Sequence, residues 1–211
     1  MAINLGGNFG DLTGSQNNSN NQSTGISLNL NKNQVLDLTK RNPGLRKVMV
    51  GAGWDISNNG SGFDVDIAAF MLDSNNRFND VSNIIFFNNK TGQGITLGGD
   101  NLTGVGNGDD EIIQIDLSAI NPSISKIVFI VTIHGAMEKR QTFGMINNSY
   151  VRLVDVDQNN KELCKFNLKE NGSTATSVIF AELNRDGSDW QFKAIGEGKI
   201  ADLNNLLSIY Q

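Results

Sequence analysis

The sequence IVFIVTI, residues 127–133, is apolar at every position except Thr132 and carries no charge. Successive side chains of a β-strand point to opposite faces, so a strand formed here is apolar on both faces. Such a strand is typical of the centre of a sheet that is covered on both sides. The segment 111–117 has apolar residues at alternate positions from Ile113 onward, which predicts a strand with one buried face.

Outward from residues 127–133, short apolar stretches recur along the chain between clusters of Gly, Asn and Asp, with only two prolines. Besides 111–117 and 126–134, the segments predicted as strands are 26–30, 35–38, 47–52, 64–72, 84–87, 150–156, 163–168, 176–183 and 190–195. The last apolar residues have helical spacing: Ile200, Leu203, Leu206, Leu207 and Tyr210. We therefore predict an all-β protein, a β-sandwich of two mainly antiparallel sheets, with a short C-terminal helix packed on a sheet.

Residues 14–25, GSQNNSNNQSTG, contain no large apolar side chain. A segment of this composition cannot bury enough apolar surface to offset the entropy lost on ordering. We therefore expect residues 1–25 to form a flexible Asn/Ser-rich leader. Residues 26–211 are expected to form one domain.

The composition excludes several classes of protein. No apolar run reaches the roughly 20 residues of a membrane-spanning helix, and the N-terminus lacks the pattern of a signal peptide. A net charge of −5 gives no bulk attraction to nucleic acid or anionic lipid. The single cysteine and single histidine exclude a disulfide framework within the chain and most zinc sites. We expect a cytoplasmic protein that binds no nucleic acid and inserts into no membrane.

The negative charge is concentrated in one part of the chain. Between Val48 and Ser125 there are ten acidic and only two basic residues, a local net charge of −8, whereas the remainder of the chain is +3. This asymmetry indicates a cation site or a basic partner. A solvated acidic face is the alternative.

Three of these carboxylates begin predicted strands. Asp64 and Asp66 share a face with Phe70 and lie about 6.5–7 Å apart, and Glu111 shares a face with Ile113. All three are therefore expected to turn inward. Because an unpaired buried carboxylate costs several kcal/mol, a bound cation would stabilise the arrangement.

The loop before residue 111 is rich in oxygen ligands for such a cation. Residues 98–111, GGDNLTGVGNGDDE, combine carboxylates, an Asn amide and glycines that let backbone carbonyls turn inward. Oxygen donors without His or Cys favour calcium over zinc or copper. An EF-hand is excluded, because Val105 takes the place of its glycine and no flanking helices are predicted.

Several motifs resemble, in order, those of the TerD family of tellurite-resistance and stress proteins. They are PGLRKVMVGAGWD at 43–55, FDVD at 63–66, GDNLTG at 99–104, GDDE at 108–111, VTIH at 131–134 and FG at 143–144. The resemblance runs from about residue 26 to the C-terminus. It implies a two-sheet sandwich that binds calcium, with two ions expected, through its acidic loops. It also implies a cytoplasmic protein associated with resistance to tellurite, phage and colicins and with general stress, whose partners are other stress or tellurite-resistance proteins.

Taken with this resemblance, the acidic residues give a set of candidate calcium ligands. They are Asp55, Asp64, Asp66, Asp100, Asn101, Gly104, Asp109, Asp110 and Glu111. Two other acidic residues, Asp73 and Asp80, are placed outside the site.

Other reactive side chains are interpreted as structural. His134 ends the most apolar segment without a Ser or Cys nucleophile signature, so we expect a structural histidine and no catalytic base. Cys164 alternates with Phe166 and Leu168 and is predicted to be buried and unreactive. Trp54 and Trp190 are predicted core residues.

We therefore expect a calcium-binding stress-response protein that acts as a scaffold or binding module and is not an enzyme. One alternative is a metal-dependent hydrolase that uses the same acidic cluster to activate water. Another is a lectin-like module in which calcium presents a ligand. A coordination shell closed by protein oxygens would favour the binding module, and an open position beside a cleft would favour the hydrolase.

Overall fold

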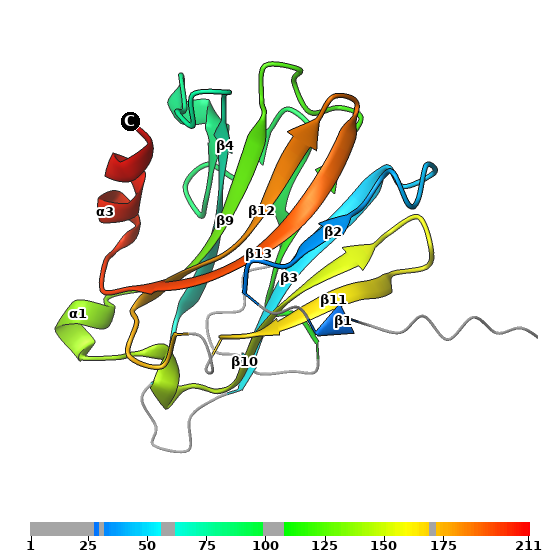
Figure 1. Cartoon of the computed structure of the whole chain (residues 1–211). Coiled ribbons are helices and arrows are strands. Elements are labelled where there is room, and N and C mark those ends of the chain that lie inside the picture. The colour runs from blue at the N-terminus through cyan, green and yellow to red at the C-terminus, as the bar shows by residue number, and fades with distance from the viewer. Residues whose placement is uncertain (1–27, 30–31, 56–61, 99–107, 169–171) are drawn as a thin grey trace, which may run out of the picture.

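A computed structural model describes residues 28–29, 32–55, 62–98, 108–168 and 172–211, which form a β-sandwich of two sheets (Figure 1). The seven-stranded sheet has the order β1 (Leu28–Asn29), β11 (Lys161–Asn167), β10 (Asn147–Asp155), β3 (Lys47–Asp55), β8 (Glu111–Asp116), β7 (Ile95–Gly98), β6 (Thr91–Gly92). The six-stranded sheet has the order β2 (Val35–Asp37), β13 (Asp189–Lys199), β12 (Ser177–Asp186), β9 (Lys126–Ile133), β4 (Val65–Leu72), β5 (Ile84–Ile85). Neighbouring strands are antiparallel, except that β1 runs parallel to β11.

The predicted sandwich is confirmed, and each predicted segment contains a strand. Only Leu28 and Asn29 of the first segment are described, and the predicted leader, residues 1–25, lies outside the described residues. Strands β6 and β7 were not predicted, because the sequence TGQGITLG around them is rich in glycine and polar residues. Ile95 and Leu97 of β7 nevertheless reach the core.

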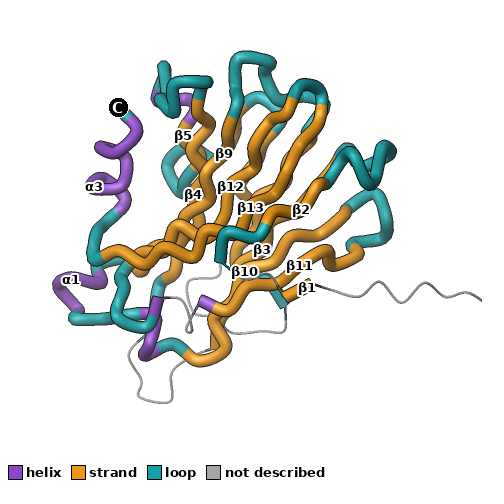
Figure 2. Tube along the Cα trace, viewed as in Figure 1, coloured by secondary structure: helices purple, strands orange, loops and turns teal. Residues whose placement is uncertain are grey.

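Strand β9 is apolar on both faces because each face is covered. Ile127 and Phe129 lie in the main core between the sheets, whereas Val128 and Ile130 lie in a second cluster on the outer face of the six-stranded sheet. That outer face is covered by the C-terminal helix α3 (Leu203–Leu207), which Figure 2 places alongside β4 and β9. The prediction of a central strand at 127–133 is therefore confirmed.

The C-terminal helix starts later than its apolar spacing suggests. Asp202 caps it by accepting a hydrogen bond from the backbone N–H of Asn205 at 2.8 Å. Leu206 is buried, and Tyr210 in the following turn η3 (Ser208–Tyr210) packs edge-on against Phe70 with ring centroids 5.8 Å apart. Ile200 was wrongly assigned to this apolar face: it precedes the cap and is exposed.

The remaining helical elements are short: η1 (Val81–Asn83), α1 (Ala136–Lys139) and η2 (Phe143–Met145). No helix in the described part of the chain combines the length and the apolar character needed to cross a membrane.

Candidate functional site

The described acidic candidates lie around the end of β3 and the starts of β4 and β8. Strands β3 and β8 pair with Ala52 opposite Glu111, so residues 109–111 lie beside the end of β3. Each of these three consecutive acidic side chains contacts a different part of the sandwich.

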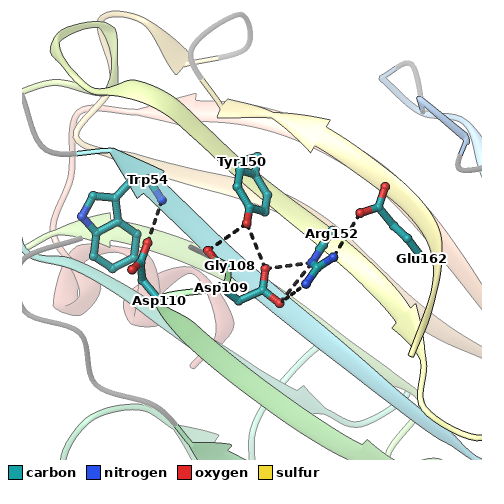
Figure 3. A network of polar contacts seen from close by, with 7 residues as sticks. All are labelled: Trp54, Gly108, Asp109, Asp110, Tyr150, Arg152 and Glu162. Carbon is teal, nitrogen blue, oxygen red and sulfur yellow. Dashed lines mark hydrogen bonds and ion pairs between the residues drawn. The ribbon is translucent and has the colours of Figure 1, made fainter. Parts of the chain in front are cut away.

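Asp109 lies against the outer face of the seven-stranded sheet, where Arg152 of β10 holds it (Figure 3). The Arg152 Nε donates to Oδ1 at 2.8 Å and Nη2 donates to Oδ2 at 2.9 Å, a bidentate pair. The Tyr150 hydroxyl reaches Oδ1 at 3.2 Å and the Gly108 carbonyl at 3.0 Å. The Asp109 side chain is only 2% exposed and both its oxygens are engaged. This carboxylate therefore anchors the residues that lead into β8 to the outer face of the seven-stranded sheet.

The electrostatics of this network agree with its geometry. The hydrogen bond to Asp109 raises the pKa of the Arg152 guanidinium, which also contacts Glu162 at 3.3 Å. Burial, together with the negative charge of Asp109, raises the pKa of Tyr150 to about 12. Tyr150 is therefore a neutral hydrogen-bond donor at physiological pH.

Two glycines of β3 make room for this network. A Cβ atom at Gly51 would overlap the Asp109 carboxylate, and one at Gly53 would overlap the Tyr150 ring. The sequence VGAGW therefore leaves a flat strand surface on which both side chains lie. This requirement explains two glycines inside a strand, where glycine is otherwise unfavourable.

Asp110 and Glu111 are both buried and turn toward the backbone of neighbouring strands. Oδ2 of Asp110 accepts a hydrogen bond from the Trp54 N–H at 2.9 Å, at the end of β3. Oε2 of Glu111 accepts one from the Ile67 N–H at 2.6 Å, in the opposite sheet. The prediction that Glu111 turns inward is therefore confirmed, since its side chain joins β8 to β4 and is 5% exposed.

Asp66 lies on the other face of its sheet. It shares a face with Phe70, as predicted, but this face belongs to the outer cluster beneath α3. Oδ2 of Asp66 is 3.9 Å from Nδ1 of His134. The expectation that Asp66 turns inward with Glu111 is therefore wrong: β4 is apolar on both faces, and the face of Ile67 is the one that meets the opposite sheet.

Asp55 and Asp64 lie at strand ends close to these residues. Asp55, the last residue of β3, is exposed and accepts a hydrogen bond from Asn148 Nδ2 at 2.6 Å. Asp64 immediately precedes β4, and its carbonyl accepts the His134 N–H at 2.7 Å. The candidates Asp100, Asn101 and Gly104 lie outside the described residues.

The described acidic side chains do not make a metal centre among themselves. Within residues 32–55, 62–98, 108–168 and 172–211, no three His, Cys, Asp or Glu side chains lie close enough together to hold an ion. The described carboxylates are hard oxygen donors, which suit calcium chemically, but a complete shell would need oxygens from elsewhere.

Comparison with known proteins places the chain in a family. A family model described as the TerD domain matches residues 26–210. The chain belongs to the TerD family. It is 40% identical to "Tellurium resistance protein TerD" of Serratia marcescens over 188 residues, which cover 88% of this chain and 97% of that protein. It is 43% identical to "Stress response protein SCP2" of Bacillus subtilis (strain 168) over 187 residues, 82% of this chain and 93% of that protein.

The TerD fold is also found in a solved structure. The crystal structure of a TerD homologue from Streptomyces coelicolor A3(2) superposes with a TM-score of 0.65 at 24% identity. The match covers 78% of this chain and 96% of that one. It supports the two-sheet architecture of this TerD-family chain.

The sequence interpretation missed Arg152 and Tyr150. The two basic residues between Val48 and Ser125 are Arg77 and Lys90, whereas Arg152 lies outside this acidic part of the sequence. The spacing of Tyr150 and Arg152 by two residues, on one face of a predicted strand, was the available signal. Locating Asp109 opposite them requires the register of β3, β8 and β10, which the sequence does not reveal.

The predictions for Cys164 and His134 of this TerD-family chain had different outcomes. Cys164 is buried as predicted, and burial raises the pKa of its thiol to about 12. His134 was expected to be a satisfied structural histidine, but its side chain is 60% exposed. The apolar strand ends at Ile133, and the following residue emerges at the surface.

Proposed function

We propose that this chain is a calcium-binding TerD-type stress protein that contributes to tellurite resistance as a non-enzymatic scaffold. The names of its relatives, which refer to tellurium resistance and to stress response, support the biological setting. We further propose a cytoplasmic location, with other stress or tellurite-resistance proteins as partners.

The observation that carries the calcium proposal is the position of acidic residues at three strand ends, those of β3, β4 and β8, where Asp110 and Glu111 are buried. The proposed ligands among the described residues are Asp55, Asp64, Asp66, Asp110 and Glu111, and the proposed ligands outside them are Asp100, Asn101 and Gly104. This donor set contains only oxygen, which a hard cation such as calcium prefers. Asp109, engaged by Arg152, anchors the loop end in this proposal and is not a ligand.

The placement of the carboxylates supports two ions. The Asp66 side chain lies on the outer face of the six-stranded sheet, whereas the Glu111 side chain reaches the inner face of that sheet from β8. We therefore propose that the two carboxylates do not share one ion. Calcium would neutralise charge on both faces and stabilise the loop ends that carry the ligands.

The proposed contribution to tellurite resistance is indirect. Reduction of an oxyanion by a protein thiol requires a reactive thiolate, whereas the buried Cys164 thiol has a raised pKa and is protonated at physiological pH. The net charge of −5 also disfavours capture of an anion. A calcium-dependent scaffold is consistent with both properties.

The proposed ligands can be distinguished from acidic residues with local roles. Replacing Asp64 or Asp66 by asparagine should weaken calcium binding about tenfold or more, because each change removes a charged ligand. Asp73→Asn and Asp80→Asn are matched controls. Asp73 accepts the N–H of Asn75 at 2.8 Å, and Asp80 accepts that of Ser82 at 2.7 Å, so both already serve exposed turns.

The measurement is the calcium dissociation constant of each variant, determined by calorimetry on metal-free protein. The controls should keep the affinity of the parent protein. A larger loss in the Asp73 or Asp80 variant than in the Asp64 and Asp66 variants would show that the ligand assignment is wrong.

A further inference from the structure

A groove of about 430 Å³ opens on the outer face of the six-stranded sheet, at the end where β9 leaves it. Asp66 and Thr132 contribute to it from β4 and β9. Residues 86–88, 134–138 and 201–204 line it from three separate segments. Figure 1 shows two of the elements concerned, α1 and the start of α3, at the same corner of the molecule. All the lining residues belong to the described part of the chain.

The groove carries apolar side chains that the fold leaves at the surface. Phe87 is 43% exposed and Met137 is 61% exposed, although both are large and apolar. Phe87 makes edge contacts with two other rings, at 5.2 Å to Phe86 and 6.5 Å to His134, measured between centroids. An exposed aromatic ring held in place by its neighbours is a ready binding surface for a partner.

The charges that line the groove are mostly negative. Its carboxylates are those of Asp66, Glu138 and Asp202, and among its lining residues His134 is the one basic side chain. Lys139, the last residue of α1, is not among the lining residues, but its Nζ donates to the carbonyl of the lining residue His134 at 3.3 Å. Aromatic rings beside carboxylates, in a concave surface, match a cation that also has an apolar or planar body.

We propose that this groove binds a basic, apolar peptide segment of a partner protein, with an arginine side chain at Phe87. A guanidinium is planar, stacks on aromatic rings, and forms bidentate pairs with carboxylates. Glu138 is an exposed carboxylate of the lining on the same helix as Met137, and Met137 offers apolar contact to the residue beside the arginine. The negative charge concentrated between residues 48 and 125 would speed the approach of such a segment.

This proposal does not require calcium, because Phe87, Met137 and Glu138, the residues it assigns to the peptide, are not proposed calcium ligands. Asp66 is common to both proposals, so its substitution cannot separate them. The test therefore leaves Asp66 unchanged and is performed on the full chain twice, with calcium in excess and with a chelator.

The probe is the peptide acetyl-Leu-Arg-Leu-Arg-Leu-amide. One control peptide contains citrulline in place of arginine, which has nearly the same shape and no charge. A second control peptide contains glutamate in place of arginine. Because the chain has a single histidine, the imidazole resonances of His134 in a nuclear magnetic resonance spectrum report directly on this groove. The arginine peptide should shift them in a saturable manner, and the citrulline peptide should bind about tenfold more weakly.

Variants locate the binding surface. Phe87→Ala and Glu138→Gln should each weaken binding of the arginine peptide about fivefold or more, since each removes one partner of the guanidinium. Val35→Ala and Asp186→Asn are matched controls, because Val35 is an exposed apolar residue on β2 and Asp186 is an exposed carboxylate paired with Lys40. Both controls should bind as the parent protein does.

Several results would overturn the proposal. These are equal binding of the arginine and citrulline peptides, no saturable shift of His134 with the arginine peptide, or tighter binding of the glutamate peptide. A dimer of the parent protein that Phe87→Ala converts to a monomer in sedimentation would show that a second copy of the chain occupies the groove instead. If calcium fails to bind but the arginine peptide still does, only the calcium proposal is lost.

Discussion

Replacing Arg152 by methionine is expected to lower the free energy of unfolding by about 3 kcal/mol. The change leaves the Asp109 carboxylate, whose side chain is 2% exposed, without its bidentate partner. A buried charge that loses its partner typically costs about 3–5 kcal/mol, and we expect the lower end because the Arg152 side chain is 28% exposed and water can partly replace it. Urea unfolding, followed by circular dichroism in the presence of chelator, measures this cost without a contribution from calcium.

Two controls separate the ion pair from general effects. Arg41→Met removes an exposed guanidinium elsewhere and should change stability by less than about 0.5 kcal/mol. Adding Asp109→Asn to Arg152→Met should restore part of the loss, because the buried charge is then removed as well. If the two substitutions lowered the free energy of unfolding by simply additive amounts, Arg152 and Asp109 would not be coupled. The proposal that Arg152 anchors Asp109 would then be disproved.

Removing calcium is expected to cause a loss of stability of similar size. A ligand that binds only the folded state stabilises it by about 4 kcal/mol when its free concentration is 1,000 times the dissociation constant. For a domain of this size the midpoint of thermal unfolding should then fall by roughly 10 °C. Differential scanning calorimetry of metal-free protein, with and without added calcium, measures the shift. Magnesium at the same concentration serves as the control and should restore less.

Metal-free protein that unfolds at the same temperature with and without calcium would contradict this expectation. The acidic residues between Val48 and Ser125 would then form a solvated acidic face, and the interactions of Asp110 and Glu111 would be those within the protein, including their hydrogen bonds to the backbone N–H groups of Trp54 and Ile67.

The architecture could be predicted from the sequence because strands such as β3, β9 and β12 are long and rich in apolar residues. The segment 127–133 is apolar at every position but Thr132, since α3 covers one face of β9 and the seven-stranded sheet covers the other. Strand β6 has only two residues, Thr91 and Gly92, too few for any period to be visible. Ile200 fits the helical spacing, yet the Asp202 cap starts the helix after it.

The site was harder to predict, for reasons that involve particular residues. Alternation correctly placed Glu111 in the interior, because β8 has a single buried face. The same reasoning failed for Asp66, because both faces of β4 are apolar and the pattern cannot tell which one meets the other sheet. The pairing of Asp109 with Arg152 joins residues 43 positions apart through the register of three strands, which no local pattern reveals.

The most direct test of calcium binding is an isothermal calorimetric titration of the metal-free protein with calcium and, separately, with magnesium. The proposed set of carboxylate, amide and carbonyl oxygens suits the larger, irregular shell of calcium, whereas magnesium prefers a compact octahedron and gives up water reluctantly. We predict saturable binding of two calcium ions per chain, at an affinity clearly above that for magnesium. The absence of saturable calcium binding, or equal affinities for the two ions, would contradict the proposal.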